Sequence, residues 1–205
     1  MNGVLILGGG GHAKVVADIL QLCGVGIQGF LDDDASAHGK IRCGLPVLGA
    51  IDDWRRFAPS GLILGIGSNA ARRAIVERLE ATPELWINAI HPRATIAASA
   101  KLERGLVIAA GAVVNPDAAL GDHVIINTSA SIDHDCAIGN YAHIAPGTHL
   151  AGAVIVEQGA FLGIGTSVIP SVKIGAWATV GAGSLILRDV PANTRAFGVP
   201  AIHRN

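Results

Sequence analysis

The sequence predicts two folds in one chain: a small α/β domain over residues 1–88, followed by a three-sided β-solenoid over residues 89–190. Three observations support this. Short apolar runs alternate with helix-like segments in the first half, and aliphatic residues recur at every sixth position in the second. The chain is also 50% hydrophobic but only 4% aromatic. A core with so few large rings must be filled by closely stacked Ile, Val, Leu and Ala side chains.

Residues 1–88 have the pattern of alternating strands and helices. Val15 and Ile19 lie four residues apart, as on the buried side of a helix. Alternation of this kind predicts a small parallel sheet with Rossmann-like topology. We expect strands at 4–7, 27–31 and 62–66, a helix after the glycines that follow the first strand, and a second helix from an N-cap at Asn69 to Ala81.

The first predicted strand runs into a loop of four glycines that opens a helix. Gly8, Gly10 and Ala13 match the pattern G-x-G-x-x-[G/A], and the acidic residues 32–34 follow about twenty positions later. Such a loop offers backbone N–H groups and the positive end of a helix dipole to a phosphate. A dinucleotide site normally needs two βαβ halves, and only one is present. We favour a nucleotide-sugar diphosphate; a structural turn and a dinucleotide remain the alternatives.

The second half repeats with a period of six residues. Beginning at Ile90, seventeen consecutive positions six apart hold Ile, Leu or Val, and the position four residues after each is usually small. This period fits neither a helix nor an alternating strand. It predicts a triangular coil with one hexad on each side, so that residues eighteen apart stack. Residues 191–205 leave the repeat and are expected to form a C-terminal tail.

Composition excludes several other classes of protein. The net charge is −1 without a basic run, so we expect no nucleic-acid partner. No apolar stretch approaches the roughly 20 residues of a membrane span, and the N-terminus lacks the basic region of a signal peptide. Three scattered cysteines imply no disulfide framework. We expect a cytoplasmic protein that binds no metal.

Several stretches resemble one family over nearly the whole chain. They are GGGGHAKVV at the first loop, FLDDD at 30–34, NAIHP at 88–92, INTSASIDHDCAIGNYAHIAPG at 126–147 and GVPA at 198–201. They resemble the hexapeptide-repeat acetyltransferases of the sialic-acid O-acetyltransferase-like subfamily, which includes N-acetyltransferases for UDP-4-amino sugars and GDP-perosamine. The resemblance implies a left-handed parallel β-helix, acetyl-CoA as cosubstrate, a nucleotide-linked 4-amino-4,6-dideoxy sugar as acceptor, and a homotrimer with active sites between subunits.

The segment Asp133-His134-Asp135 is the expected catalytic centre. Transfer of an acetyl group to an amine needs a base that works near neutral pH, which His134 can provide, and Asp135 can fix its tautomer. His134 occupies an outward position of its hexad; the alternative is an ordinary solvated histidine. Stacking predicts that Gly152 lies one coil above it, where a backbone N–H could stabilise the oxyanion of the reacting thioester.

The remaining expected site residues can be grouped by the part of the two substrates that each is expected to contact. The resemblance assigns His143 and Gly152 to the acetyl side of CoA, and we expect Asn127 to contact the sugar. For the diphosphate we expect Gly8, Gly10 and His12, for the nucleoside Asp33 and Asp34, and for close approach to the pantetheine arm Gly163, Gly165 and Ala182.

Cys136 falls in a small inward slot, so we expect it to be buried and the acetyl group to be transferred directly. Two other activities remain as alternatives. One is O-acetylation of a free sugar such as sialic acid. The other is a zinc hydratase of the γ-carbonic-anhydrase type, for which the chain offers His123, His143 and His149.

Overall fold

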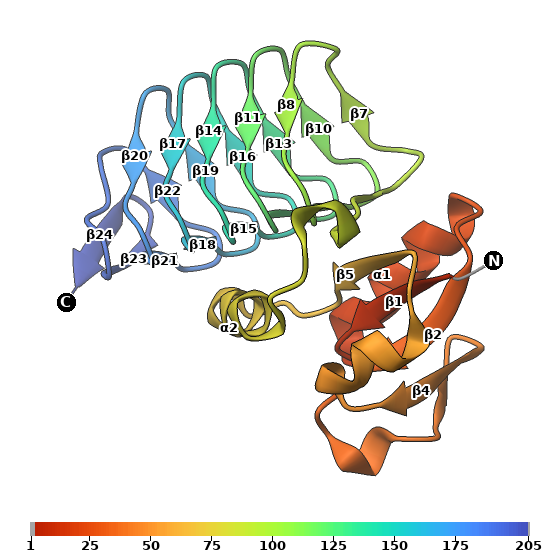
Figure 1. The fold of residues 1–205 in the computed structure, drawn as a ribbon. Coiled ribbons are helices and arrows are strands. Elements are labelled where there is room, and N and C mark those ends of the chain that lie inside the picture. The colour runs from red at the N-terminus through yellow and green to blue at the C-terminus, as the bar shows by residue number, and fades with distance from the viewer. Residues whose placement is uncertain (1–2, 205) are drawn as a thin grey trace. The chain divides into compact units, whose positions relative to one another are not determined.

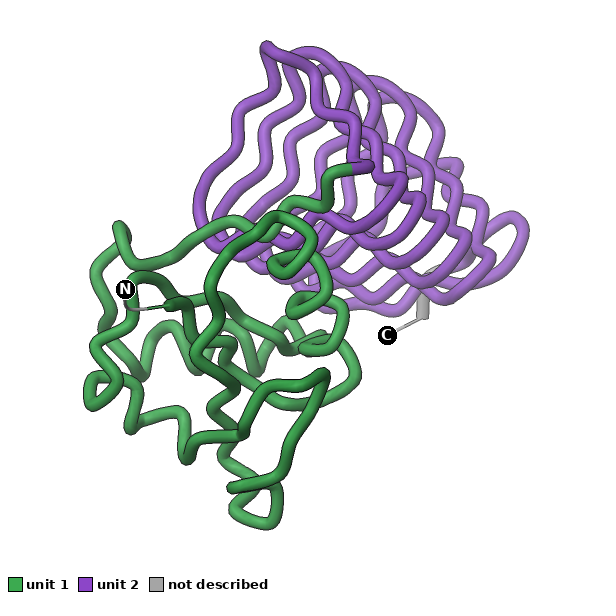
Figure 2. The backbone as a smooth tube through the Cα atoms, turned by 90° about the vertical axis from the view of Figure 1, so that its right-hand side faces the viewer, with its two compact units in different colours: residues 1–92 green, residues 93–205 purple. Residues whose placement is uncertain are grey.

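The structure is a computed structural model that describes residues 3–204. The chain divides into two compact units, Met1–Pro92 and Arg93–Asn205, shown in different colours in Figure 2. Within residues 3–204, no helix combines the length and the apolar character that a bilayer crossing requires.

The first unit is built on a five-stranded sheet in the order β3-β4-β2-β1-β5 (Figure 1). The strands β1, β2 and β5 pair in parallel, as predicted. The strand β4, which also pairs in parallel with β2, and its antiparallel hairpin partner β3 were not predicted from the sequence. The elements are β1 (Val4–Leu7), α1 (Gly11–Leu22), β2 (Ile27–Leu31), η1 (Ala35–Ala37), β3 (Ile41–Arg42), β4 (Leu45–Gly49), η2 (Ile51–Phe57), β5 (Gly61–Leu64), α2 (Asn69–Leu79), η3 (Pro83–Leu85) and β6 (Ala89–Ile90).

The neighbouring strands β1 and β5 are buried along their whole length, which explains why they are continuously apolar rather than alternating. Their leucines pack with the side chains of Trp54, Ile75 and Trp86 in one hydrophobic cluster. This cluster holds the carboxyl ends of β1 and β2 in place, where the glycine loop and the acidic segment begin.

The start of α2 differs by one residue from the prediction. Ser68, not Asn69, is the N-cap: its Oγ accepts a hydrogen bond from the N–H of Ala71 at 3.4 Å. Asn69 is the first helical residue and is buried. Both are good capping residues, so the sequence alone did not distinguish them.

The second unit is a parallel β-helix of stacked three-sided coils (Figure 1). Each side of a coil contributes a strand of two residues, and the strands of successive coils form three sheets. The first face contains β7 (Thr95–Ile96), β10 (Val113–Val114), β13 (Ser131–Ile132), β16 (His149–Leu150), β19 (Ser167–Val168) and β22 (Leu185–Ile186). The second face contains β8 (Lys101–Leu102), β11 (Ala119–Leu120), β14 (Ala137–Ile138), β17 (Ile155–Val156) and β20 (Lys173–Ile174). The third face contains β9 (Val107–Ile108), β12 (Ile125–Ile126), β15 (His143–Ile144), β18 (Phe161–Leu162) and β21 (Thr179–Val180).

The register of the coils is eighteen residues throughout, as the hexads predict. Ser131 pairs with His149, and Ile132 pairs with Leu150. The repeated aliphatic residue points inward, so that Ile132 and Leu150 are buried while the residue before each faces outward. Beyond the repeat, β23 (Arg195–Gly198) adds to the third face and pairs with β24 (Ala201–Arg204).

Between residues 105 and 183, each corner turns through one residue in the left-handed region, three positions after the inward aliphatic residue. Some of these residues are glycines, such as Gly147 and Gly159, which have φ of +62° and +68°. Other corners use different residues, among them Asp135 at +59° and Trp177 at +58°. The corner N–H donates to the carbonyl of the coil below, as from Asp135 to Pro116 at 3.2 Å. The neighbouring coils therefore impose the turn, and glycine is not required for it.

Gly159 and Gly147 test this stacking, because both adopt the left-handed turn but only one has a ring above it. A Cβ on Gly147 would meet open space, so Gly147→Ala should cost about 1 kcal/mol of unfolding free energy. A Cβ on Gly159 would lie 2.5 Å from the Trp177 ring, which should add about 1–3 kcal/mol. Chemical denaturation of the two variants compares them directly. Equal stabilities would contradict the packing of Trp177 on Gly159.

Candidate active site

The predicted catalytic pair lies at the first corner of the β-helix, the turn from the first face to the second. Asp135 occupies the left-handed position of that turn, and its Oδ2 lies 2.8 Å from Nδ1 of His134. Both side chains are well exposed, at 61% and 59%. A carboxylate can only accept, so this contact places the imidazole proton on Nδ1 and leaves Nε2 as a proton acceptor.

Two carboxylates influence the basicity of this histidine. The hydrogen bond that His134 donates to Asp135, and then the charge of Asp133, raise the pKa of His134 above its ordinary value of 6.5. Asp133 makes no hydrogen bond to the ring; its Oδ1 accepts the backbone N–H of His134 at 2.8 Å. His134 is therefore a stronger base than a free histidine, although it is exposed.

Gly152 lies against the imidazole, one coil above it. A Cβ at this position would fall 2.6 Å from Cε1 and 2.7 Å from Nε2 of His134, so the ring occupies the space that any side chain would need. The Gly152 carbonyl accepts from Ser171, and the N–H of Ala153 donates to His134, but no acceptor for the Gly152 N–H is found in the described part of the chain. One amide donor is thus available beside the base.

Asn127 and His143, predicted to contact the sugar and the acetyl group, lie together on the third face. Nδ2 of Asn127 is 3.1 Å from Nε2 of His143, and the His143 ring meets Phe161 edge-on at 5.2 Å. In a three-sided coil the third face is opposite the first corner. A single chain therefore does not bring these two residues to His134.

Gly163, Gly165 and Ala182 lie at the corner between the third and first faces. A Cβ on Gly163 would fall 2.6 Å from the N atom of Ala182, so close packing of coils already explains that glycine. Gly165 has a φ of +68° and its N–H donates to Pro146 at 3.0 Å. The structure thus gives both glycines a role in the coil.

The first unit contains a cavity of about 310 Å³ at the carboxyl ends of its central strands. Four of the predicted substrate-binding residues line it: Gly8, Gly10, His12 and Asp33. Asp34 does not. Its carboxylate accepts the N–H of Ser36 at 2.9 Å and caps η1.

The glycine loop has specific reasons for its composition. Gly8 has a φ of +96°, and a Cβ there would overlap the side chain of Ile66. The N–H of Gly9 donates to Asp32 at 2.6 Å, which ties the loop to the acidic segment. Gly10 is the N-cap of α1 without a side-chain hydrogen bond, and a Cβ on it would meet open space. The first turn of α1 therefore faces the cavity without a covering side chain.

His12 stands in this cavity beside a buried cation. Burial, and then the charge of Arg72, lower the pKa of His12 to about 4, so its ring is neutral near neutral pH. Arg72 is 1% exposed and donates to the carbonyls of Ile66 at 3.3 Å and Gly67 at 2.9 Å. These contacts shape the loop that forms the opposite wall of the cavity.

Asp33 is held by its own neighbours. Oδ1 accepts the N–H of Ile51 at 3.1 Å, and Oδ2 accepts from Arg78 at 2.9 Å. Arg78 also pairs with Asp52 at 3.0 Å. The sequence analysis gave Arg78 no role, and an arginine late in an amphipathic helix carries no signal that would identify one.

Cys136 is 1% exposed, as its place in the hexad predicts, and burial raises the pKa of its thiol. Both features oppose a role as an acetylated nucleophile. Of the other histidines, His123 stacks on Tyr141 at 5.3 Å, and His149 lies 2.8 Å from the hydroxyl of Ser131. Among residues 3–204, no three His, Cys, Asp or Glu side chains are grouped so that they could hold a metal ion.

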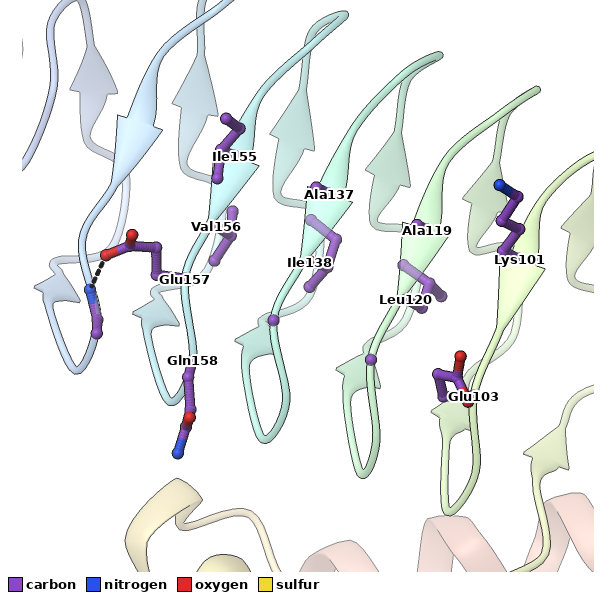
Figure 3. Close-up of a pocket in the computed structure, with 13 residues that line it drawn as sticks. Lys101, Glu103, Ala119, Leu120, Ala137, Ile138, Ile155, Val156, Glu157 and Gln158 are labelled. Atoms are coloured by element: carbon purple, nitrogen blue, oxygen red, sulfur yellow. Dashed lines mark hydrogen bonds between the residues drawn. The ribbon is translucent and has the colours of Figure 1, made fainter.

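A further hollow lies on the second face, away from these groups (Figure 3). Its volume is about 610 Å³, and Ala119, Ala137 and Ile155 form its floor. At one end Glu157 accepts the N–H of Ala176 at 2.9 Å, the contact drawn as a dashed line. The floor of the hollow is apolar, and Lys101, Glu103, Glu157 and Gln158 lie at its two ends.

Known proteins share both units. Residues 3–79 match the model of the PglD N-terminal domain family. The perosamine N-acetyltransferase from Caulobacter crescentus, solved in complex with CoA and GDP-perosamine, is 40% identical, with 100% of this chain and 98% of that one covered and a TM-score of 0.93. The chain belongs to this acetyltransferase family. The acetyltransferase domain of PglB from Neisseria gonorrhoeae FA1090, solved with acetyl-CoA, is 33% identical over 98% of this chain and 99% of that one, with a TM-score of 0.90.

A curated relative supports the same assignment. The UDP-N-acetylbacillosamine N-acetyltransferase of Bacillus subtilis (strain 168) is 40% identical over 114 residues, which are 54% of this chain. The chain spans about half, or less, of the length of the curated relatives that it matches.

Gly152→Ala tests the contact between this glycine and the base. The φ of Gly152 lies outside the left-handed region, so alanine fits the backbone, but its Cβ must displace the imidazole. We expect kcat to fall about 100-fold, because displacement by an ångström is enough to misplace a reacting group. Thermal unfolding should change little. Full turnover in this variant would show that the ring position does not matter.

Proposed function

We propose that the protein transfers the acetyl group of acetyl-CoA to the amine of a nucleotide-linked 4-amino-4,6-dideoxy sugar. The observation that carries this proposal is the first corner, where Asp135 holds Nδ1 of His134 at 2.8 Å and the N–H of Gly152 lies beside the ring. The perosamine N-acetyltransferase has been solved with CoA and GDP-perosamine both in its natural form and with one histidine replaced by asparagine or alanine.

The corner can perform the reaction without a covalent enzyme intermediate. The sugar nitrogen attacks the thioester carbon while Nε2 of His134 takes the proton that the nitrogen loses. A C–N bond forms, the C–S bond breaks, and the departing sulfur receives the proton from His134. The Gly152 N–H donates to the carbonyl oxygen as negative charge develops there; such a donor commonly contributes about 3 kcal/mol.

The first corner also offers a surface that suits the arm of CoA. Ile169 and Leu187 follow Ala151 in the same row, one and two coils further on, and are 38% and 46% exposed. Apolar side chains next to an amide donor fit a pantetheine chain that ends in a thioester. Gly163, Gly165 and Ala182 are proposed as further points of close backbone approach.

We place the nucleoside diphosphate in the cavity of the first unit. Gly8, Gly10 and the first turn of α1 present N–H groups to phosphate oxygens, and the neutral His12 can donate one hydrogen bond and accept another. Asp33 is proposed for the nucleoside. Asp34 is proposed to contribute indirectly, by capping η1, the short helix that follows the acidic segment.

Asn127 and His143 are proposed to act on the site of a neighbouring copy. They lie on the face opposite His134, so a complete site needs the third face of one chain against the first corner of another. A homotrimer with three shared sites satisfies this requirement by cyclic symmetry.

His134→Ala tests the base. We expect kcat to fall by orders of magnitude while the affinity for CoA stays nearly unchanged, since the substitution removes the proton acceptor and not the binding surface. Isothermal titration and steady-state kinetics separate the two quantities. Retained turnover would exclude His134 as the base.

The pH profile gives an independent readout. The base must be neutral, and its raised pKa places the acidic limb of kcat/KM above the ordinary value of 6.5. Asp135→Asn removes the largest cause of that shift, so the limb should move to lower pH.

Subunit mixing tests the shared site. His134→Ala and His143→Ala should each be nearly inactive alone. Every mixed trimer would contain one site with both histidines intact, so co-expressed and doubly purified mixtures should recover about one third of wild-type turnover. If both histidines belonged to a site within one chain, mixing would recover nothing.

A further inference from the structure

Below the catalytic histidine lies a polar contact that the reaction described above does not use. Asn115 sits one coil beneath Asp133 in the first corner, and its Nδ2 donates to Oδ1 of Asp133 at 3.0 Å. The same oxygen accepts the backbone N–H of His134 at 2.8 Å. Asn115 is thus connected to the base through a single carboxylate oxygen.

We propose that Asn115 is a positioning residue for the base: by fixing the Asp133 carboxylate, it holds the backbone of His134 and keeps a second negative charge beside the imidazole. This inference rests on the proposed role of His134. Asn115 touches neither the ring nor the groups that react.

The equivalent positions of the other coils show that the turn at the first corner forms without the Asn115–Asp133 pair. The first residue after the strand in successive coils is Ala97, Asn115, Asp133, Ala151, Ile169 and Leu187. Only the two members under and next to His134 are polar. The coil is formed equally well by alanine and aliphatic residues, so the pair serves this corner in particular.

Local capping alone would not need Asn115. Asn127 begins the turn at a different corner, and its Oδ1 accepts the N–H of the next residue, Thr128, at 2.8 Å. The bond from Asp133 to His134 is of this common kind. What distinguishes the first corner is a second donor from the coil below, which removes the freedom of the carboxylate to rotate away.

The two carboxylates around His134 then have separate tasks. Asp135 accepts from Nδ1 and selects the tautomer. Asp133, turned toward the backbone and held there by Asn115, adds charge without competing for a ring nitrogen. Its charge is the second cause of the raised pKa of His134. Nε2 stays directed at Gly152 because both sides of the residue are fixed.

The test compares Asn115→Leu and Asp133→Asn with Asn140→Leu. At another corner, the side chain of Asn140 accepts the N–H of Asp122 at 3.0 Å from the neighbouring coil. Asn140→Leu removes this hydrogen bond between coils and is therefore the matched control. We expect Asn115→Leu to lower kcat about 10-fold or more at unchanged KM for acetyl-CoA. In Asp133→Asn the charge is lost, so the acidic limb of kcat/KM should also move to lower pH. Asn140→Leu should change neither quantity.

Two outcomes would overturn the inference. One is an Asn115→Leu variant that loses only as much unfolding free energy as Asn140→Leu and keeps its kcat. The other is an Asp133→Asn variant whose pH profile is that of the natural protein. The background of His134→Ala separates this inference from the proposed function. If His134 is the base, Asn115→Leu should cause no further loss of the residual activity there. If His134→Ala itself retains turnover, the proposed function fails first.

Discussion

Hydrogen bonding between coils, in a register of eighteen residues, is the constraint on which the candidate site depends. It determines which side chain lies above which, independently of their distance along the chain. Gly152 lies on the His134 ring and Asn115 lies under Asp133 for this reason. The proposed catalytic corner is therefore built from three consecutive coils. The lowest supplies the Asn115 amide that fixes Asp133, the middle one supplies the base with its two carboxylates, and the highest supplies the backbone N–H of Gly152.

The two units place a histidine in opposite electrostatic environments. In the first, backbone N–H groups of a glycine loop and the end of α1 face a cavity in which a histidine is kept neutral by burial and by Arg72. In the second, an exposed histidine is made more basic by neighbouring carboxylates. An anionic ligand suits the former, and removal of a proton from an amine suits the latter.

The sequence predicted the architecture well because the hexad period is imposed by geometry. It located β1, β2 and β5, the buried Cys136, and the stacking of Gly152 over His134. It missed β4 and the two-residue strand β3 that forms a hairpin with it, and it placed the cap of α2 at Asn69 instead of Ser68. The contact of Arg78 with Asp33 could not be predicted, since the two residues belong to segments whose relative placement no local pattern specifies. Asn115 could have been found by counting eighteen residues back from Asp133.

The regular coil also has a consequence for how such a protein can change in length. A duplication of eighteen residues outside positions 115–152 would lengthen the β-helix by one coil and leave the order of the coils around His134 unchanged. The same duplication between His134 and Gly152 would insert an additional coil between them, so that Gly152 would no longer lie on the His134 ring. The β-helix can therefore gain coils at its ends, whereas the eighteen-residue spacing of the coils around His134 must be kept.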